Sequence, residues 1–156
     1  LKKSYSLPRK RQPKDLYSFR DFLNLARLEM DKYGLCDWKL ELDHAKVRAG
    51  ACHFREKKIS FSRNFIKHAD DLDINDTILH EIAHALVGPN HGHDSLWKTM
   101  AKKIGCSAKR CHTLEFSAYK WVRFCTNHCW EQKTHRRKPN LVCKKCGAPV
   151  IYKKNI

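Results

Sequence analysis

The sequence contains no long run of apolar residues. No stretch approaches the roughly 18 apolar residues of a membrane-spanning helix, and the basic residues near the start of the chain are not followed by the apolar segment of a secretory signal. From these absences we expect no membrane association and an intracellular protein, in the cytoplasm or nucleoid, or in the nucleus if the source is eukaryotic. Thiols stay reduced in those compartments, so the eight cysteines are expected to be free or metal-bound rather than paired as disulfides.

Acidic residues are nearly absent from both ends of the chain. Residues 1–14 hold six Lys or Arg and no acid, and residues 119–156 hold ten against Glu131 alone. Residues 15–118 are almost neutral, with sixteen basic and fifteen acidic side chains, although the whole chain carries +16. Positive charge confined to an arm and a tail indicates attachment to a polyanion such as DNA, single- or double-stranded. A merely solvated basic surface is the alternative for the tail, and a nuclear address is an alternative for the arm.

The most informative motif is His80-Glu81-Ile82-Ala83-His84. At 3.6 residues per turn, the two histidines are separated by one turn plus about 40°, so both imidazoles leave one face of a helix. Glu81 lies about 100° from His80 and can reach a water held by the same metal ion. The motif therefore predicts a catalytic Zn²⁺ site with two ligands, His80 and His84, and one base, Glu81.

The residues around this motif favour a helix that ends sharply. Apolar residues recur at helical spacing from Ile78 to Val87, Asp73 or Asn75 could cap the start, and Gly88-Pro89 ends it. A second helix is predicted from about Asp94 to Ile104. A catalytic zinc usually takes a third protein ligand, and His91 and His93 both lie in the connecting turn. Their spacing alone does not choose between them.

These features resemble the SprT-like metalloproteases, a family that includes the Spartan proteases, which digest proteins crosslinked to DNA. In that family the third ligand opens a His-x-x-x-Trp or His-x-x-x-Phe element, which His93 to Trp97 fits. Segments 48–52 and 59–63 are similar to the two strands that precede the metal helix. The resemblance therefore implies His93 as the third ligand, a zinc-dependent peptidase, and Glu81 as the base that activates water. It covers roughly residues 16 to 150.

A second metal site is predicted near the C-terminus. Cys125 and Cys129, then Cys143 and Cys146, form two close pairs separated by thirteen residues, as in a zinc ribbon that holds one structural Zn²⁺. The first pair has three intervening residues, so His128 is an alternative to Cys129. Of the other cysteines, Cys36 and Cys52 are interpreted as small core residues. Cys106 and Cys111, with His112, are a weaker candidate for metal binding.

The tail mixes its cations with aromatic rings, a composition typical of nucleic-acid binding. Cations contact phosphates, and an exposed ring stacks on an unpaired base at about 1 to 3 kcal/mol. The predicted nucleic-acid-binding residues are Lys120, Arg123, Trp130, Lys133, Arg136, Arg137, Lys138, Lys144 and Lys145.

The predicted fold class is α+β, a helical zincin-like metalloprotease core with a small three-stranded antiparallel sheet, plus a C-terminal zinc ribbon. A helix is expected over 16–33, with Phe22, Ala26 and Leu28 among its core residues, and strands over 38–43, 49–54 and 58–63. The predicted domains are a basic arm (1–14), a SprT-like metalloprotease domain (15–118) and a zinc-ribbon subdomain (119–156). We expect a monomer.

Three functions are compatible with these features. The favoured one is a zinc endopeptidase that acts on proteins bound or crosslinked to DNA and is recruited by its basic ends. The second is a nucleic-acid-binding protein with two structural zincs and no turnover, accessory to transcription or replication. The third is a general zinc peptidase that does not depend on nucleic acid. Glu81 discriminates the second from the first, and the basic tail discriminates the third.

Overall fold

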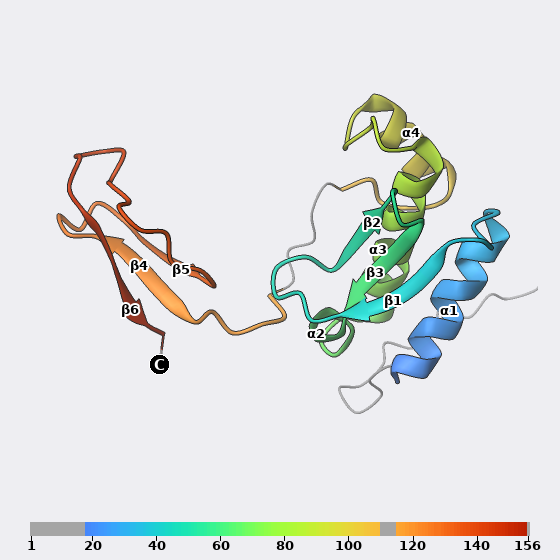
Figure 1. Ribbon diagram of the computed structural model, residues 1–156, viewed down its shortest axis with the longest axis horizontal. Coiled ribbons are helices and arrows are strands. Elements are labelled where there is room, and N and C mark those ends of the chain that lie inside the picture. Colours follow the sequence, from blue (N-terminus) through green and yellow to red (C-terminus); the bar gives the residue numbers. More distant parts are fainter. Residues whose placement is uncertain (1–17, 110–114, 156) are drawn as a thin grey trace, which may run out of the picture. The chain divides into compact units, whose positions relative to one another are not determined.

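The computed structural model describes residues 18–109 and 115–155, so the predicted basic arm lies outside the described residues. The chain divides into two compact units, the first ending at Phe116 and the second beginning at Ser117. Figure 1 shows helices and a small sheet in the first unit and strands alone in the second.

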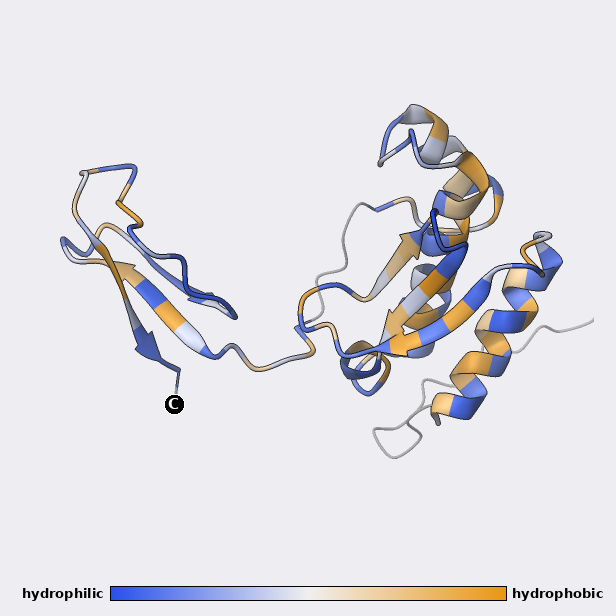
Figure 2. Cartoon of the chain, in the orientation of Figure 1, coloured by the Kyte–Doolittle hydropathy of each residue, from blue (hydrophilic) through white to orange (hydrophobic). Residues whose placement is uncertain are grey.

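The first unit begins with helix α1 (Phe19–Lys32), which Ser18 caps by accepting a hydrogen bond from the backbone N–H of Asp21. Gly34, at φ 77°, follows the helix and reverses the chain, a conformation that glycine adopts without strain. Apolar residues recur along α1 in Figure 2, and the buried ones are Phe22, Ala26 and Met30, spaced four residues apart. Leu28 was wrongly assigned to the core: its side chain is 68% exposed, because it lies on the opposite side of the helix.

Strands β1 (Lys39–Asp43), β2 (Gly50–His53) and β3 (Lys58–Ser62) form a sheet in the order β1-β3-β2. The prediction of an all-antiparallel sheet was wrong. β2 and β3 form an antiparallel hairpin, but β1 pairs with β3 in parallel, with Leu40 opposite Ile59. The loop 44–49 carries the chain past β3, which is therefore the central strand. Its residues Ile59 to Ser62 are buried, and a strand buried on both faces needs a hydrogen-bonding partner on each edge.

The two faces of the sheet differ in chemistry. Ile59 and Phe61 point into the main core with α1 and α3, and the Phe61 ring meets that of Phe22 edge-on at 5.1 Å. Ser60 and Ser62 point to the other face, where the Ser60 hydroxyl donates to Asp43 and the Ser62 hydroxyl donates to the carbonyl of Ala45. Hydrogen bonding offsets the cost of burying these hydroxyls. Helices α1 and α3 therefore pack on one face of the sheet. In the view of Figure 1, α3 passes behind the strands.

Four-residue helix α2 (Arg63–Ile66) leads into the long helix α3 (Asp71–Val87) and then α4 (Ser95–Lys103). α3 begins before either predicted cap: Asp70 is the capping residue, and its carboxylate accepts from the backbone N–H of Asp73. The predicted stop is confirmed, because Gly88 at φ 92° ends α3. A second, smaller apolar cluster, which includes Leu79, Ala83 and Trp97, joins α3 to α4.

The second unit is an antiparallel sheet of β4 (Trp121–Cys125), β5 (Glu131–Thr134) and β6 (Val150–Lys154), with β4 in the centre. Its buried cluster is small, consisting of Cys125, Cys143 and Val150. A core of this size supplies little stability by itself, so the unit needs an additional cross-link, such as a bound metal ion. Within the residues that the structure describes, no helix is both long and apolar enough to cross a membrane.

Candidate metal centres and nucleic-acid surface

Three histidines of the first unit point their Nε2 atoms at one place. His80 and His84 leave the same face of α3, and the Nε2 atom of His93 lies 2.9 Å from that of His80 and 3.1 Å from that of His84. Zinc bound to imidazole at about 2.0 to 2.1 Å in tetrahedral geometry separates its ligand nitrogens by about 3.3 Å. The three atoms thus have the spacing and the chemistry of a zinc site with an open fourth position.

Asp94 holds the turn that carries His93. One oxygen of its carboxylate accepts from the backbone N–H of Trp97 and so caps α4, while the other lies 2.7 Å from Nδ1 of His91. His91 is therefore engaged with Asp94, and the group of converging nitrogens is formed by His80, His84 and His93. The spacing of the sequence left His91 and His93 as alternatives, and in the folded turn it is His93 that lies with His80 and His84.

The indole ring of Trp97 packs against all three imidazoles. Its side chain is fully buried, and its ring centroid lies 4.7 Å from that of His80, 5.1 Å from that of His84 and 4.5 Å from that of His93. The ring restricts the orientations of all three histidines. Burial, and then the neighbouring charge of His93, lowers the pKa of His84 to about 4. The imidazole of His84 is therefore neutral at pH 7, as a metal ligand must be.

Glu81 lies on α3 beside the histidines, and its side chain is only 6% exposed. Burial raises the pKa of Glu81 to about 8, and the positive charge of Arg48 opposes this shift in part. A divalent cation next to the carboxylate favours its charged form. Glu81 thus has the setting of a proton acceptor that ionises near neutral pH, which suits a general base.

The second unit brings four thiols together. The Sγ atoms of Cys125, Cys129, Cys143 and Cys146 all lie within 4.8 Å of one another, and that of Cys146 is 3.4 Å from those of Cys125 and Cys129. Tetrahedral zinc thiolate sites separate their sulfurs by about 3.8 Å. The four residues fit a structural Zn²⁺, which would supply the cross-link that the small core requires.

The irregular first pair closes through a left-handed turn at His128, whose φ is 54°. The backbone N–H of His128 donates to the carbonyl of Cys125, and its side chain is exposed, outside the thiol group. In the second pair, burial acts to raise the pKa of Cys143, but hydrogen bonds from the backbone N–H groups of Lys145 and Cys146 and from Nε1 of Trp130 outweigh it and lower the pKa to about 6. Donors directed at this sulfur favour the thiolate form that binds metal.

The remaining described cysteines differ in their burial. Cys52 is half-buried at the edge of the main core, as predicted for a small core residue, whereas Cys36 was wrongly assigned there and is exposed in the turn after α1. Cys106 is buried against α3 and α4, with its thiol directed at the carbonyl of Asp76. Cys111 and His112 lie outside the described residues.

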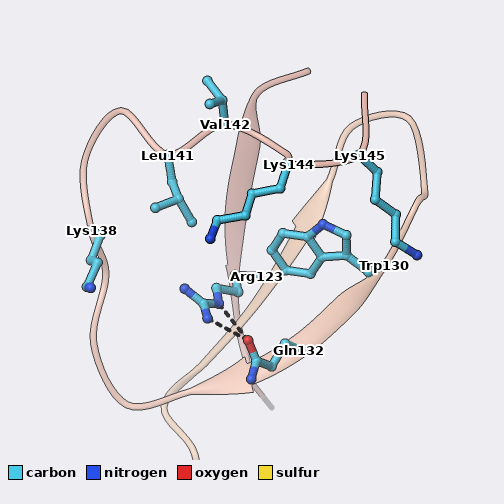
Figure 3. Close-up of a pocket in the computed structure, with 8 residues that line it drawn as sticks. All are labelled: Arg123, Trp130, Gln132, Lys138, Leu141, Val142, Lys144 and Lys145. Atoms are coloured by element: carbon cyan, nitrogen blue, oxygen red, sulfur yellow. Dashed lines mark hydrogen bonds between the residues drawn. The ribbon is translucent and has the colours of Figure 1, made fainter. Parts of the chain in front are cut away.

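One face of the second unit carries a hollow of about 470 Å³. Figure 3 shows Arg123 hydrogen-bonded to Gln132 in the middle of it, with the Trp130 ring beside Lys144. The guanidinium of Arg123 lies over the Trp130 ring, 5.7 Å from its centroid. The lining residues are Arg123, Trp130, Gln132, Lys138, Leu141, Val142, Lys144 and Lys145.

Strand pairing shows on which face of the sheet other predicted nucleic-acid-binding residues lie. Arg137 and Lys120 lie over the ring of Trp121, 4.4 Å and 5.9 Å from its centroid, and Trp121 alternates onto the same sheet face as Arg123. Lys133 pairs with Val122 and so lies on the opposite face. Arg136 is exposed in the turn after β5. Sequence reasoning missed Gln132, although the alternation from Trp130 along β5 places both on one face.

The helix with two histidines and a glutamate, the third histidine beyond a sharp turn, and the small sheet beside them make a metallopeptidase-like fold. A profile of the SprT-like family matches residues 20–118, and the chain belongs to the SprT-like family. The resemblance identified from the sequence is therefore confirmed. No curated protein matches the chain.

Proposed function

We propose that this protein is a zinc endopeptidase that cleaves proteins associated with or crosslinked to DNA. The observation that carries the proposal is the convergence of the Nε2 atoms of His80, His84 and His93 next to the buried carboxylate of Glu81. Membership of the SprT-like family supports the same chemistry. Zn²⁺, when bound, would supply Lewis acidity toward water and toward a peptide carbonyl.

The residues of the proposed active site have separate roles. His80, His84 and His93 hold the ion, and Trp97 keeps their rings in place. Glu81 accepts a proton from the attacking water and gives it to the departing amine, so one carboxylate serves as base and then as acid. An extended substrate would pair with the edge of β2 that does not face β3. Contacts of that kind are made to backbone groups, so sequence preference would be weak.

Recruitment to DNA is proposed for the second unit. Its hollow combines an aromatic ring with the cations of Arg123, Lys138, Lys144 and Lys145, which suits stacking of an unpaired base and contact with phosphates. Trp121 and Arg137 extend the same face. We infer that the protein binds DNA through this face, as a monomer, and that bound DNA brings protein substrates to the first unit.

The decisive experiment measures cleavage of a DNA-binding protein such as a histone by wild type and Glu81→Gln, with and without DNA, together with zinc content. Loss of cleavage in Glu81→Gln at unchanged zinc, with stimulation of the wild type by DNA, is the expected result. Cleavage that ignores DNA would identify a general peptidase. Two bound zincs with DNA binding but no cleavage by the wild type would identify a non-catalytic nucleic-acid-binding protein.

The recruiting face is tested by two variants that each remove one positive charge. Arg123→Ala changes the hollow, whereas Lys133→Ala changes the opposite face of the same sheet. We expect Arg123→Ala to weaken DNA binding and to reduce the slope of log affinity against log salt by about 1. Lys133→Ala should leave both nearly unchanged. Equal losses in the two variants would show that net charge alone, rather than this face, governs binding.

A further inference from the structure

Gly50, the first residue of β2, lies directly against the side chain of Glu81. A Cβ atom at position 50 would lie 2.7 Å from Cγ of Glu81, 2.8 Å from its Oε1 and 3.0 Å from its Cδ. Real Cβ atoms essentially never come within 3.0 Å of a heavy atom from a residue that is not a neighbour in the chain. The space in which any other residue would begin its side chain is therefore filled by the carboxylate arm of Glu81.

Backbone conformation does not explain the glycine. The described glycines with positive φ are Gly34, Gly88, Gly105 and Gly147. Gly50 is instead a regular strand residue opposite Phe61 of β3, a conformation that alanine adopts freely. Glycine within a strand often marks a close approach by another group, and here that group is Glu81.

The electrostatic setting of Cys52 agrees with a Glu81 carboxylate that lies along β2. Cys52 is two residues further along the strand, so its side chain leaves the same face as the missing side chain of Gly50. Burial, and then the negative charge of Glu81, raises the pKa of the Cys52 thiol to about 12. The Glu81 side chain is itself only 6% exposed, so its carboxylate lies against this strand rather than out in solvent.

Polar contacts on the other face of β2 hold the strand in place. Nε2 of His53 lies 3.1 Å from the hydroxyl of Ser60, and that hydroxyl donates to Asp43 at 2.8 Å. Arg48, in the loop that enters β2, pairs with the same carboxylate at 2.7 Å. This polar network joins all three strands, so a side chain added at position 50 would displace Glu81 rather than the strand.

We propose that Gly50 is a positioning residue for Glu81. The absent side chain lets the backbone of β2 set the rotamer and the depth of the carboxylate, and so its distance from the group of three histidines. The inference rests on the proposed function only in assuming that Glu81 is the base. The strand expected to bind substrate would then also locate the base, which fixes substrate and base relative to one another.

The first test is Gly50→Ala, with Gly92→Ala as a matched control. Gly92 is exposed, no heavy atom lies within 4 Å of the Cβ position there, and its φ is not in the left-handed region. We expect Gly50→Ala to keep its zinc and its KM but to lose about 100-fold in kcat, the scale of a misplaced catalytic group. Gly92→Ala should keep both constants. An unchanged kcat in Gly50→Ala would overturn the proposal.

A second readout needs neither activity nor metal. In zinc-free protein with ¹³C-labelled glutamate, the Glu81 carboxyl resonance is identified by its absence from Glu81→Gln. It should shift in Gly50→Ala and stay in place in Gly92→Ala. If Glu81→Gln were fully active, the proposed function would fail, yet this resonance would still show whether Gly50 positions Glu81.

A double-mutant cycle covers the case in which Gly50→Ala is poorly folded. Glu81→Ala removes the Cγ atom that the new methyl group would meet. The free energy of unfolding should therefore fall more when Gly50→Ala is made in the wild type than when it is made in Glu81→Ala. Equal losses in the two backgrounds would mean that the methyl group does not meet Glu81, and the proposal would be wrong.

Discussion

Replacing Glu81 by glutamine should make the zinc-free protein more stable, by an amount that grows with pH. Burial raises the pKa of Glu81 from 4.5 to about 8 in the folded protein. Between these two values the unfolded chain releases a proton that the folded chain must keep, so folding becomes less favourable as pH rises. The loss begins near the unfolded pKa and is complete once pH exceeds the folded pKa.

The size of the effect follows from the two pKa values. At pH 7 the unfolded carboxyl is fully ionised and the folded one is mostly protonated, which costs about 3 kcal/mol of stability. Glutamine does not ionise, so the variant avoids this cost. Burying its amide carries a cost of its own, but that cost does not depend on pH. The diagnostic quantity is therefore how the stability difference changes with pH.

The assay is urea unfolding of the chelator-treated chain at several pH values between about 4 and 9. Wild type, Glu81→Gln and the control Glu115→Gln share the same second unit, so its contribution cancels. Glu115 is exposed, so its replacement controls for the loss of one negative charge at the surface. A stability difference between Glu81→Gln and wild type that stays flat across this range would refute the reasoning. The wild type alone is no test, because the lowered pKa of His84 adds stability as pH rises from about 4.

Three further predictions concern the groups around the two candidate metal centres. Asp94→Ala should lower the free energy of unfolding by about 1 kcal/mol, because it removes a helix cap. It should also release zinc from the three histidines at a lower chelator concentration than Ser95→Ala does. Equal zinc retention in the two variants would contradict the role given to the Asp94 turn. Trp97→Ala should lower the free energy of unfolding by about 3 to 5 kcal/mol, measured with urea, because a fully buried ring is removed; a loss below about 1 kcal/mol would show that the ring is not packed as described. In Cys143→Ser, metal analysis should find one zinc fewer than in the wild type. Stimulation by DNA should be abolished, while peptide cleavage without DNA persists. Unchanged zinc content would remove Cys143 from the ligand set.

Local sequence was sufficient for the features that depend on helix or turn geometry. His80, Glu81 and His84 are related by one turn of one helix, and Gly88 ends that helix because of its own backbone freedom. The pair Cys143 and Cys146 likewise closes within one turn, with Gly147 at φ 73°. These relations involve neighbours in the chain, so no distant contact is needed to predict them.

Tertiary structure alone decided the relations between distant segments. The order β1-β3-β2 depends on which strand is buried on both faces, and hydrophobic alternation does not distinguish a parallel neighbour from an antiparallel one. His93 rather than His91 joins the other histidines because Asp94 engages His91 and caps α4, a consequence of how the turn folds. Gly50 meets Glu81 across thirty residues of sequence because β2 packs on α3. Sequence thus determined which side chains are candidates for the chemistry, and packing determined which of them meet.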